Sequence, residues 1–410
     1  MQFIKTHWVL LASSLVALIA IAITGLGMTR TGVVTAMQER VRSAGEIDGL
    51  RSNPRNQESI DAEKERGRQF DVQYQATLDA ATQINAREPL LAEVFGSGAS
   101  GDRLQLAYRF QETYKDKLYE LPRDLQAGGS PTPQDVQDET ERIAEQALRK
   151  AAETTETTET KEPTKKGGGA EPSGAKSPTG SADLGEAQRR AAIRKAHSVR
   201  IYAEVDPQRS SFHVSPIIQG EGAPTARDMW HAQVGLWIQE DIANAIRKLN
   251  DEVAQGLDAK DANVANMAVK RLVSTQITGY VAADGQVVSF DKVGGQTSQP
   301  PGSSSSTLSS LTGRKSDAQF DVVRFAFTVI VDERELLKLV DRVTRENFHQ
   351  LVGIEYTTVP PGRQEGDYYY GEAPVVRATL DFEGYMTRKA YEKMIPADVL
   401  TELSGKPAGK

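Results

Sequence analysis

The chain has 410 residues, no cysteine, and 56 acidic against 49 basic residues, which gives a net charge of −7 at pH 7. The lack of cysteine excludes disulfides, thiolate metal sites and cysteine nucleophiles. The acidic balance argues against a broad basic surface for nucleic acid or for an anionic membrane. The length allows two domains of ordinary size together with connecting segments.

The N-terminal segment carries a long uncharged run at residues 6–29. A helix that rises about 1.5 Å per residue would extend roughly 36 Å over this run, whereas the hydrocarbon core of a bilayer measures about 30 Å. The run therefore predicts a single transmembrane anchor at 8–29, behind a short cytoplasmic head at 1–7.

A cleavable secretory signal is the alternative for the same segment. Lys5, the apolar stretch after it and the small residues Ala20 and Ala22 fit such a signal. Residues 21–28 stay apolar, however, where a cleavable signal would turn polar, so an uncleaved anchor is favoured. The flanking charges leave the orientation open. Because the head is too short to hold a domain, we expect a single-pass protein of the inner (cytoplasmic) membrane with most of its chain in the periplasm.

Helical patterns follow the anchor at 30–125. Apolar residues recur three and four positions apart, first at Val34, Met37 and Val41 and then at 59–87. Two such stripes fit either a coiled coil between chains or a hairpin that packs on its own domain. We predict a helical stalk for this region and leave self-association through it open.

The next segment, 126–195, is poor in apolar residues. Threonine and glutamate alternate at 154–162, and a stretch rich in Lys, Gly, Pro and Ser follows. Such a composition buries too little apolar surface to offset the entropy cost of ordering the chain. We predict a disordered linker with short polar helices on either side of it.

The second half of the chain holds the clearest α/β pattern. We predict helices at 227–255 and 333–347, strands at 271–282, 287–293, 320–331, 350–359 and 375–386, and a Ser/Gly-rich linker at 294–319. The order of these elements predicts an α+β fold with one or two ferredoxin-like αβ modules. The modules are expected at 196–293 and 320–396, before a tail at 397–410.

This arrangement resembles the PilO-like proteins of type IV pilus assembly and their relatives in type II secretion. The residues that carry the resemblance most specifically are 321–325, the predicted helix at 333–347 and the segment 368–377, beside the short head, anchor and stalk. The resemblance implies an inner-membrane assembly protein that dimerises with itself or with a sister protein. It implies no catalytic residues.

Motifs for catalysis, metal binding or cofactor binding are missing from the sequence. No HxH, HExxH or GxSxG spacing occurs. Residues 96–101 match the spacing GxGxxG, but the stretch before them reads as a helix rather than the strand that a dinucleotide site needs. We therefore predict no enzyme, no metal and no cofactor. The histidines are His7, His197, His213, His231 and His349.

The best candidates for an interaction surface are aromatic. Tyr368, Tyr369 and Tyr370 are adjacent, and side chains alternate between the two faces of a strand, so at least one of them should be exposed. Tyrosine suits protein interfaces because it combines a large contact area with a polar tip. Trp230 and Trp237 lie seven positions apart on one helix side and are the further candidates, although such a pair is more often part of a core.

Two functions remain open on these grounds. The first is a membrane-anchored, non-catalytic scaffold whose αβ modules bind a second copy or a related membrane-anchored protein, with no nucleic acid or small molecule involved. The second is a membrane-tethered extracytoplasmic sensor or ligand-binding domain. A deep apolar pocket would favour the sensor, whereas a filled core with an exposed sheet edge or aromatic patch would favour the scaffold.

Overall fold

The computed structural model describes residues 16–19, 57–95, 102–156, 181–204, 210–220, 222–291, 312–360 and 366–405. The chain divides into two compact units, Met1–Leu78 and Asp79–Lys410. The described part of the first unit consists of residues 16–19 and the larger part of helix α4 (Gln57–Asn85), whose side chains there are mostly exposed. The last residues of α4 belong to the second unit.

The second unit contains the remaining described elements. Its helices are α5 (Arg103–Asp124), α6 (Pro133–Glu156), α7 (Ser181–Ser198), α8 (Ala226–Ala254), α10 (Leu336–Glu346), α11 (Arg388–Tyr391) and α12 (Ala397–Leu403). Its strands are β1 (Ala127–Gly128), β2 (Ile201–Tyr202), β3 (Val269–Val281), β4 (Val287–Ser289), β5 (Phe320–Asp332), β6 (His349–Val359) and β7 (Val375–Thr387).

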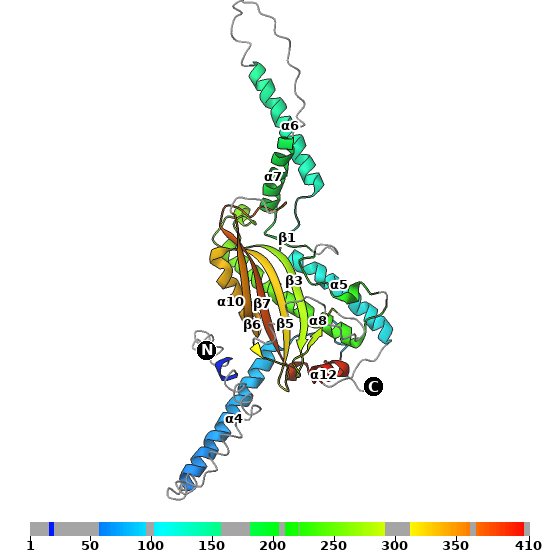
Figure 1. Ribbon diagram of the computed structural model, residues 1–410, viewed down its shortest axis with the longest axis vertical. Helices are drawn as coiled ribbons and strands as arrows, with labels where there is room; N and C mark the ends of the chain where they lie inside the picture. The colour runs from blue at the N-terminus through cyan, green and yellow to red at the C-terminus, as the bar shows by residue number, and fades with distance from the viewer. Residues whose placement is uncertain are drawn as a thin grey trace, which may run out of the picture. The chain divides into compact units, whose positions relative to one another are not determined.

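All of these strands join one mixed, seven-stranded sheet with the order β1-β2-β3-β5-β7-β6, and β4 pairs with β3 beside this path. The four long strands β3, β5, β7 and β6 pair antiparallel with one another, while β1 pairs parallel with β2 and β2 parallel with β3. Figure 1 shows the long strands side by side. The predicted fold class is therefore wrong: strands from both expected modules form a single sheet instead of separate ferredoxin-like units.

The pairing of β3 with β5 explains this correction. It runs from Val269 opposite Val331 to Val281 opposite Val322, across the segment 294–319 that was predicted to separate two modules. The entropy cost of closing a loop grows only slowly with its length. A long connection can therefore close an extended strand pair, and the composition of the connection does not reveal whether it does so.

The prediction of a membrane-spanning helix, and with it of a single-pass inner-membrane location, is also wrong. Among the described residues, no helix combines the length and the apolar composition needed to cross a membrane. Of the expected anchor at 8–29, the structure describes only the helical residues 16–19. Hydropathy reports composition alone, whereas a span also requires a continuous helix of about 20 residues.

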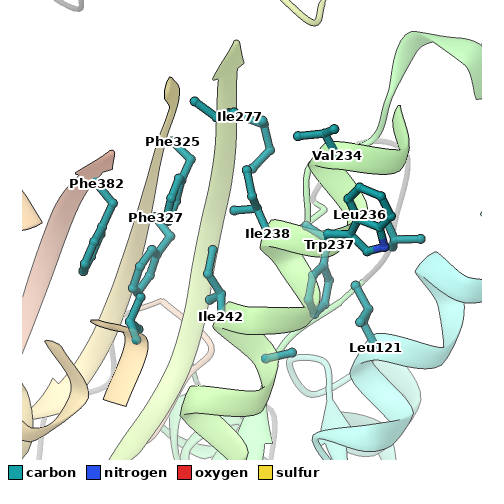
Figure 2. Close-up of a cluster of buried hydrophobic side chains, with 14 of the residues drawn as sticks. Leu121, Val234, Leu236, Trp237, Ile238, Ile242, Ile277, Phe325, Phe327 and Phe382 are labelled. Carbon is teal, nitrogen blue, oxygen red and sulfur yellow. The ribbon is translucent and has the colours of Figure 1, made fainter. Parts of the chain in front are cut away.

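Helices α8 and α10 cover one face of the sheet and form the main core with it. Figure 2 shows Phe325, Phe327 and Phe382 on the sheet facing the side of α8 that carries Ile238 and Ile242. The rings of Phe325 and Phe382 stack with centroids 5.4 Å apart. The other side of α8 packs against α5, so α8 is buried along most of its length, including polar side chains such as Asp228, Gln239 and Asp241.

The start of α8 is fixed by a capping box. The side chain of Thr225 accepts a hydrogen bond from the backbone N–H of Asp228, and the carboxylate of Asp228 accepts one from the backbone N–H of Thr225. These bonds satisfy donors that a helix N-terminus leaves without partners inside the helix. They fix the residue at which α8 begins.

The opposite face of the sheet is covered at one end by α7. Ala192 and Ala196 of this helix pack with Tyr202, Val264 and Ile330 in a second apolar cluster. Farther along this face the half-buried side chains of Thr328 and Thr379 share a hydrogen bond of 3.0 Å across β5 and β7. Helices α6 and α7, which lie within the segment predicted as a linker, pack against each other.

Candidate functional site

The three adjacent tyrosines make most of their contacts inside the chain. Tyr369 and Tyr370 are buried, and Tyr368 is half-buried. The ring of Tyr368 lies 5.0 Å from that of Tyr202, and the guanidinium carbon of Arg271 lies 3.6 Å from the centre of the Tyr368 ring. The structure thus assembles these tyrosines into a packed cluster under α7, and their role in an interface stays a prediction.

The two tryptophans belong to the core. Trp230 is fully buried and donates through Nε1 to the hydroxyl of Tyr280 (2.9 Å), while Trp237 is buried and donates to the carbonyl of Glu88 (3.3 Å). Their rings meet edge to face with centroids 5.8 Å apart. Figure 2 shows Trp237 on the side of α8 that faces Leu121 of α5.

The most exposed apolar side chains of the sheet lie instead on its edge strand β6. Among the described residues β6 pairs with β7 only, so its other side offers unpaired backbone groups. Residues 354–358 are all exposed, with Ile354 at 37% and Tyr356 at 59% exposure. Leu337 of α10, the helix that packs against β6, is 75% exposed. We call residues 353–359 the β6 edge.

The base of β6 is held by a buried ionic network. Nε2 of His349 donates to Oδ2 of Asp241 on α8 at 2.8 Å, and Asp241 also pairs with Arg87, which in turn donates to the carbonyl of Trp237 at 2.8 Å. Burial would raise the pKa of Asp241, but the hydrogen bond from His349 and the charge of Arg87 outweigh it and lower this pKa. The network ties β6 to α8 and to the segment after α4.

A second set of polar contacts docks the end of α4 beside this network. The buried side chain of Asn85 donates to the carbonyl of Tyr385 (3.0 Å) and to Oδ1 of Asn347 (2.9 Å), and it accepts from the backbone N–H of Thr387 (2.6 Å). A buried amide with its hydrogen bonds satisfied fixes the position of the groups around it. The turn that leads into β6 is thus held from a second side.

Hollows also open among the described residues of this unit, one of them beside the ionic network. A cleft of about 490 Å³ between α5, α8 and α10 is lined by charged residues, and burial raises the pKa of Glu240 in its wall. A smaller one of about 310 Å³ lies at the tyrosine cluster. The first is lined among others by Arg87, Lys117, Asp124, Glu240, Asp241 and Arg247, and the second by Tyr202, Glu204, Ser210, Ser211, Arg271 and Tyr368.

The structure also shows where two of the histidines considered in the sequence lie. In the described part of the chain, no group of three or more His, Asp or Glu side chains is placed to hold a metal ion. His349 engages Asp241, and His231 is buried in the core. Residues 96–101, with the GxGxxG spacing, lie outside the described residues.

Comparisons with protein-family models, with curated protein sequences and with solved structures found no match to this chain. Fold and site therefore define a class only, a mixed α/β protein with one seven-stranded sheet and an exposed edge strand. No comparison supports type IV pilus assembly. With the predicted anchor also overturned, neither pilus assembly nor a membrane location is part of the function proposed below.

The edge residues were not singled out from the sequence, although the strand was. A strand at 350–359 was predicted from its β-branched and aromatic content, but its position in the sheet depends on β7 inserting between β5 and β6. Alternating Ile354 and Tyr356, in a strand that itself contains no lysine and no proline, was the only local signal.

Proposed function

We propose that this chain is a non-catalytic assembly protein whose α/β unit binds another protein, either a second copy or a related chain. The observation that carries the proposal is the β6 edge, which presents exposed apolar side chains together with a strand border that pairs with no other strand among the described residues. Unpaired backbone N–H and C=O groups on a sheet edge are satisfied readily by a strand from another chain.

The composition of the strand supports this reading. Edge strands of proteins that stay monomeric commonly carry lysine, proline or an inward-pointing charge that blocks further pairing. Residues 349–359 contain no lysine and no proline, and their only carboxylate is that of Glu355. The network at His349 and the packing of α10 also hold the strand in place, so little conformational entropy is left to lose on binding.

The ligand-binding alternative receives less support. It called for a deep apolar pocket among the strands, whereas the two hollows described above are lined largely by charged and hydroxyl-bearing side chains. Several of those side chains are already engaged with one another, as Lys117 is with Glu120 at 2.6 Å. The assembly role is therefore preferred.

Chemical crosslinking of the full-length chain in the cells that produce it, followed by mass spectrometry, tests the proposal. We expect crosslinked peptides that join the α/β unit to a second copy or to one recurrent protein. If the chain is recovered only with crosslinks inside single molecules, the assembly role is contradicted.

A further inference from the structure

The β6 edge has a symmetry of its own. A register shift between Leu351 and Gly353 marks a bulge, and regular pairing with β7 then continues to Val359. Tyr356 is the midpoint of this regular segment. A bulge interrupts any strand that would pair along it, so 353–359 is the longest uninterrupted length of the strand that a new partner can use.

The direction of the backbone groups follows from the pairing with β7. Just before the strand, the backbone N–H of Tyr385 donates to the carbonyl of Phe348 at 2.8 Å, so the backbone carbonyl of Phe348 points towards β7. Along an antiparallel strand, the backbone N–H and C=O groups of successive residues point alternately towards one neighbouring strand and away from it. The extra residue of the bulge shifts this alternation by one position. Ile354, Tyr356 and Thr358 therefore turn their backbone N–H and C=O groups outward.

Resting on the proposed function, we infer that the partner of this edge is a second copy of the chain, paired antiparallel about a two-fold axis at Tyr356. A two-fold interface requires one surface to be complementary to itself. With the axis at Tyr356, the whole regular segment pairs, Ile354 lies opposite Thr358 of the second copy, and Tyr356 lies opposite its own equivalent.

The single charged residue of the β6 edge, Glu355, favours an axis at Tyr356 over an axis at a neighbouring residue. An axis at Glu355 would place two carboxylates directly opposite each other, and a parallel pairing in register would line them up on adjacent strands. An axis at Tyr356 places Glu355 opposite Thr357 instead. An axis at Ile354 would run the pairing into the bulge, and one at Thr357 would extend it past the end of β6 at Val359.

Paired in this way, the four long antiparallel strands of each copy become one continuous sheet. The pair buries a short strand and few side chains beyond it, which is small beside the roughly 1,600 Å² of a standard interface. We therefore expect a reversible dimer with a dissociation constant of about 1 μM or weaker.

Cysteine pairing tests the register directly, because the natural chain has no cysteine. Two full-length variants are prepared, Ile354→Cys and Thr358→Cys, one of them with an affinity tag, and are oxidised mildly alone and mixed. Residues that form a hydrogen-bonded antiparallel pair have Cα atoms about 5.5 Å apart, which lies within the range of disulfides. Tyr356 is untouched in both variants, and circular dichroism verifies that each is folded.

We expect the mixture to yield a disulfide-linked dimer that contains one chain of each kind, at least tenfold more than either variant alone. Equal crosslinking in all three samples, or none in the mixture, overturns the inference. If the inference fails while crosslinking in cells still joins the α/β unit to a partner, the proposed function stands with a different surface. If both experiments show only single chains, both fail.

Discussion

His231 is a titratable side chain enclosed in the core. It lies on α8, is 2% exposed, and stacks on Phe290 with ring centroids 4.5 Å apart. Neither ring nitrogen has a hydrogen-bond partner in the described structure. Burial, and to a lesser degree the nearby positive charge of Arg227, lowers its pKa to about 3. The folded protein therefore holds this imidazole neutral.

This burial makes stability depend on pH in a defined window. The pKa is about 6.5 in the unfolded chain and about 3 in the folded one, so the unfolded state takes up the proton first as the pH falls. The contribution of neutral His231 to the free energy of unfolding is fully present above pH 6.5. Below that pH it declines by up to about 1.4 kcal/mol per pH unit. Between pH 7.5 and 5.0, the wild type should lose about 2 kcal/mol more than the variant His231→Phe.

Urea unfolding of both proteins at the two pH values measures this difference. His197 lies on the exposed side of α7, so the variant His197→Gln should lose as much stability on acidification as the wild type. An equal loss in the wild type and in His231→Phe would contradict the assignment of the acid response to His231.

At the scale of elements, two glycines differ in whether their backbone conformation and surroundings would accept a side chain. Gly279 of β3 has a φ of +135°, and a Cβ atom added there would lie 1.9 Å from the carbonyl oxygen of Val288 on β4. Gly235 of α8 is helical, and an added Cβ would meet ordinary contacts, the closest at 3.8 Å from Ile277. The same substitution should therefore have opposite consequences at these two positions.

The variant Gly279→Ala should lose about 2 kcal/mol or more of unfolding free energy, because alanine is strained at this φ and clashes with the β4 backbone. The matched variant Gly235→Ala should be neutral or gain up to about 1 kcal/mol from its better helix propensity. Chemical denaturation compares the two. Equal effects of the two substitutions would contradict the backbone geometry of the β3–β4 hairpin.

Individual elements were predictable to the extent that their patterns are local. The strand expected at 375–386 forms at Val375–Thr387, and the helix expected at 227–255 forms at Ala226–Ala254. Residues 211–214, which include Phe212 and Val214, form no strand, since they lie in a bend and a segment without regular structure before a 3-10 helix at Pro216–Ile218. A few β-branched or aromatic residues do not make a strand where no neighbour pairs with it.

At the scale of the whole α/β unit, the joining of strands was beyond local patterns. The sheet is continuous because β3 pairs with β5 across a long connection. β6 is an edge strand because β7 lies between it and β5. The docking residues are equally non-local, because Asn85 and Arg87 find their partners far along the chain, at Thr387 and Asp241. Such side chains look like ordinary polar residues on a helix and after it.

The proposed pairing has a consequence for the assembly as a whole. A charge placed at its centre would stand opposite itself in the second copy, and lysine on an edge strand opposes further pairing. The variant Tyr356→Lys should therefore weaken self-association at least tenfold. Gln276 is exposed on β3, away from the edge, so Gln276→Lys is the matched control for the added charge.

Sedimentation velocity of the full-length chain across a range of concentrations tests this central claim most directly. We predict that the wild type and Gln276→Lys shift from monomer to dimer as the concentration rises, while Tyr356→Lys stays monomeric with unchanged circular dichroism. A wild type that remains monomeric at every concentration, or a Tyr356→Lys variant that dimerises as readily as the wild type, would contradict self-assembly through the β6 edge.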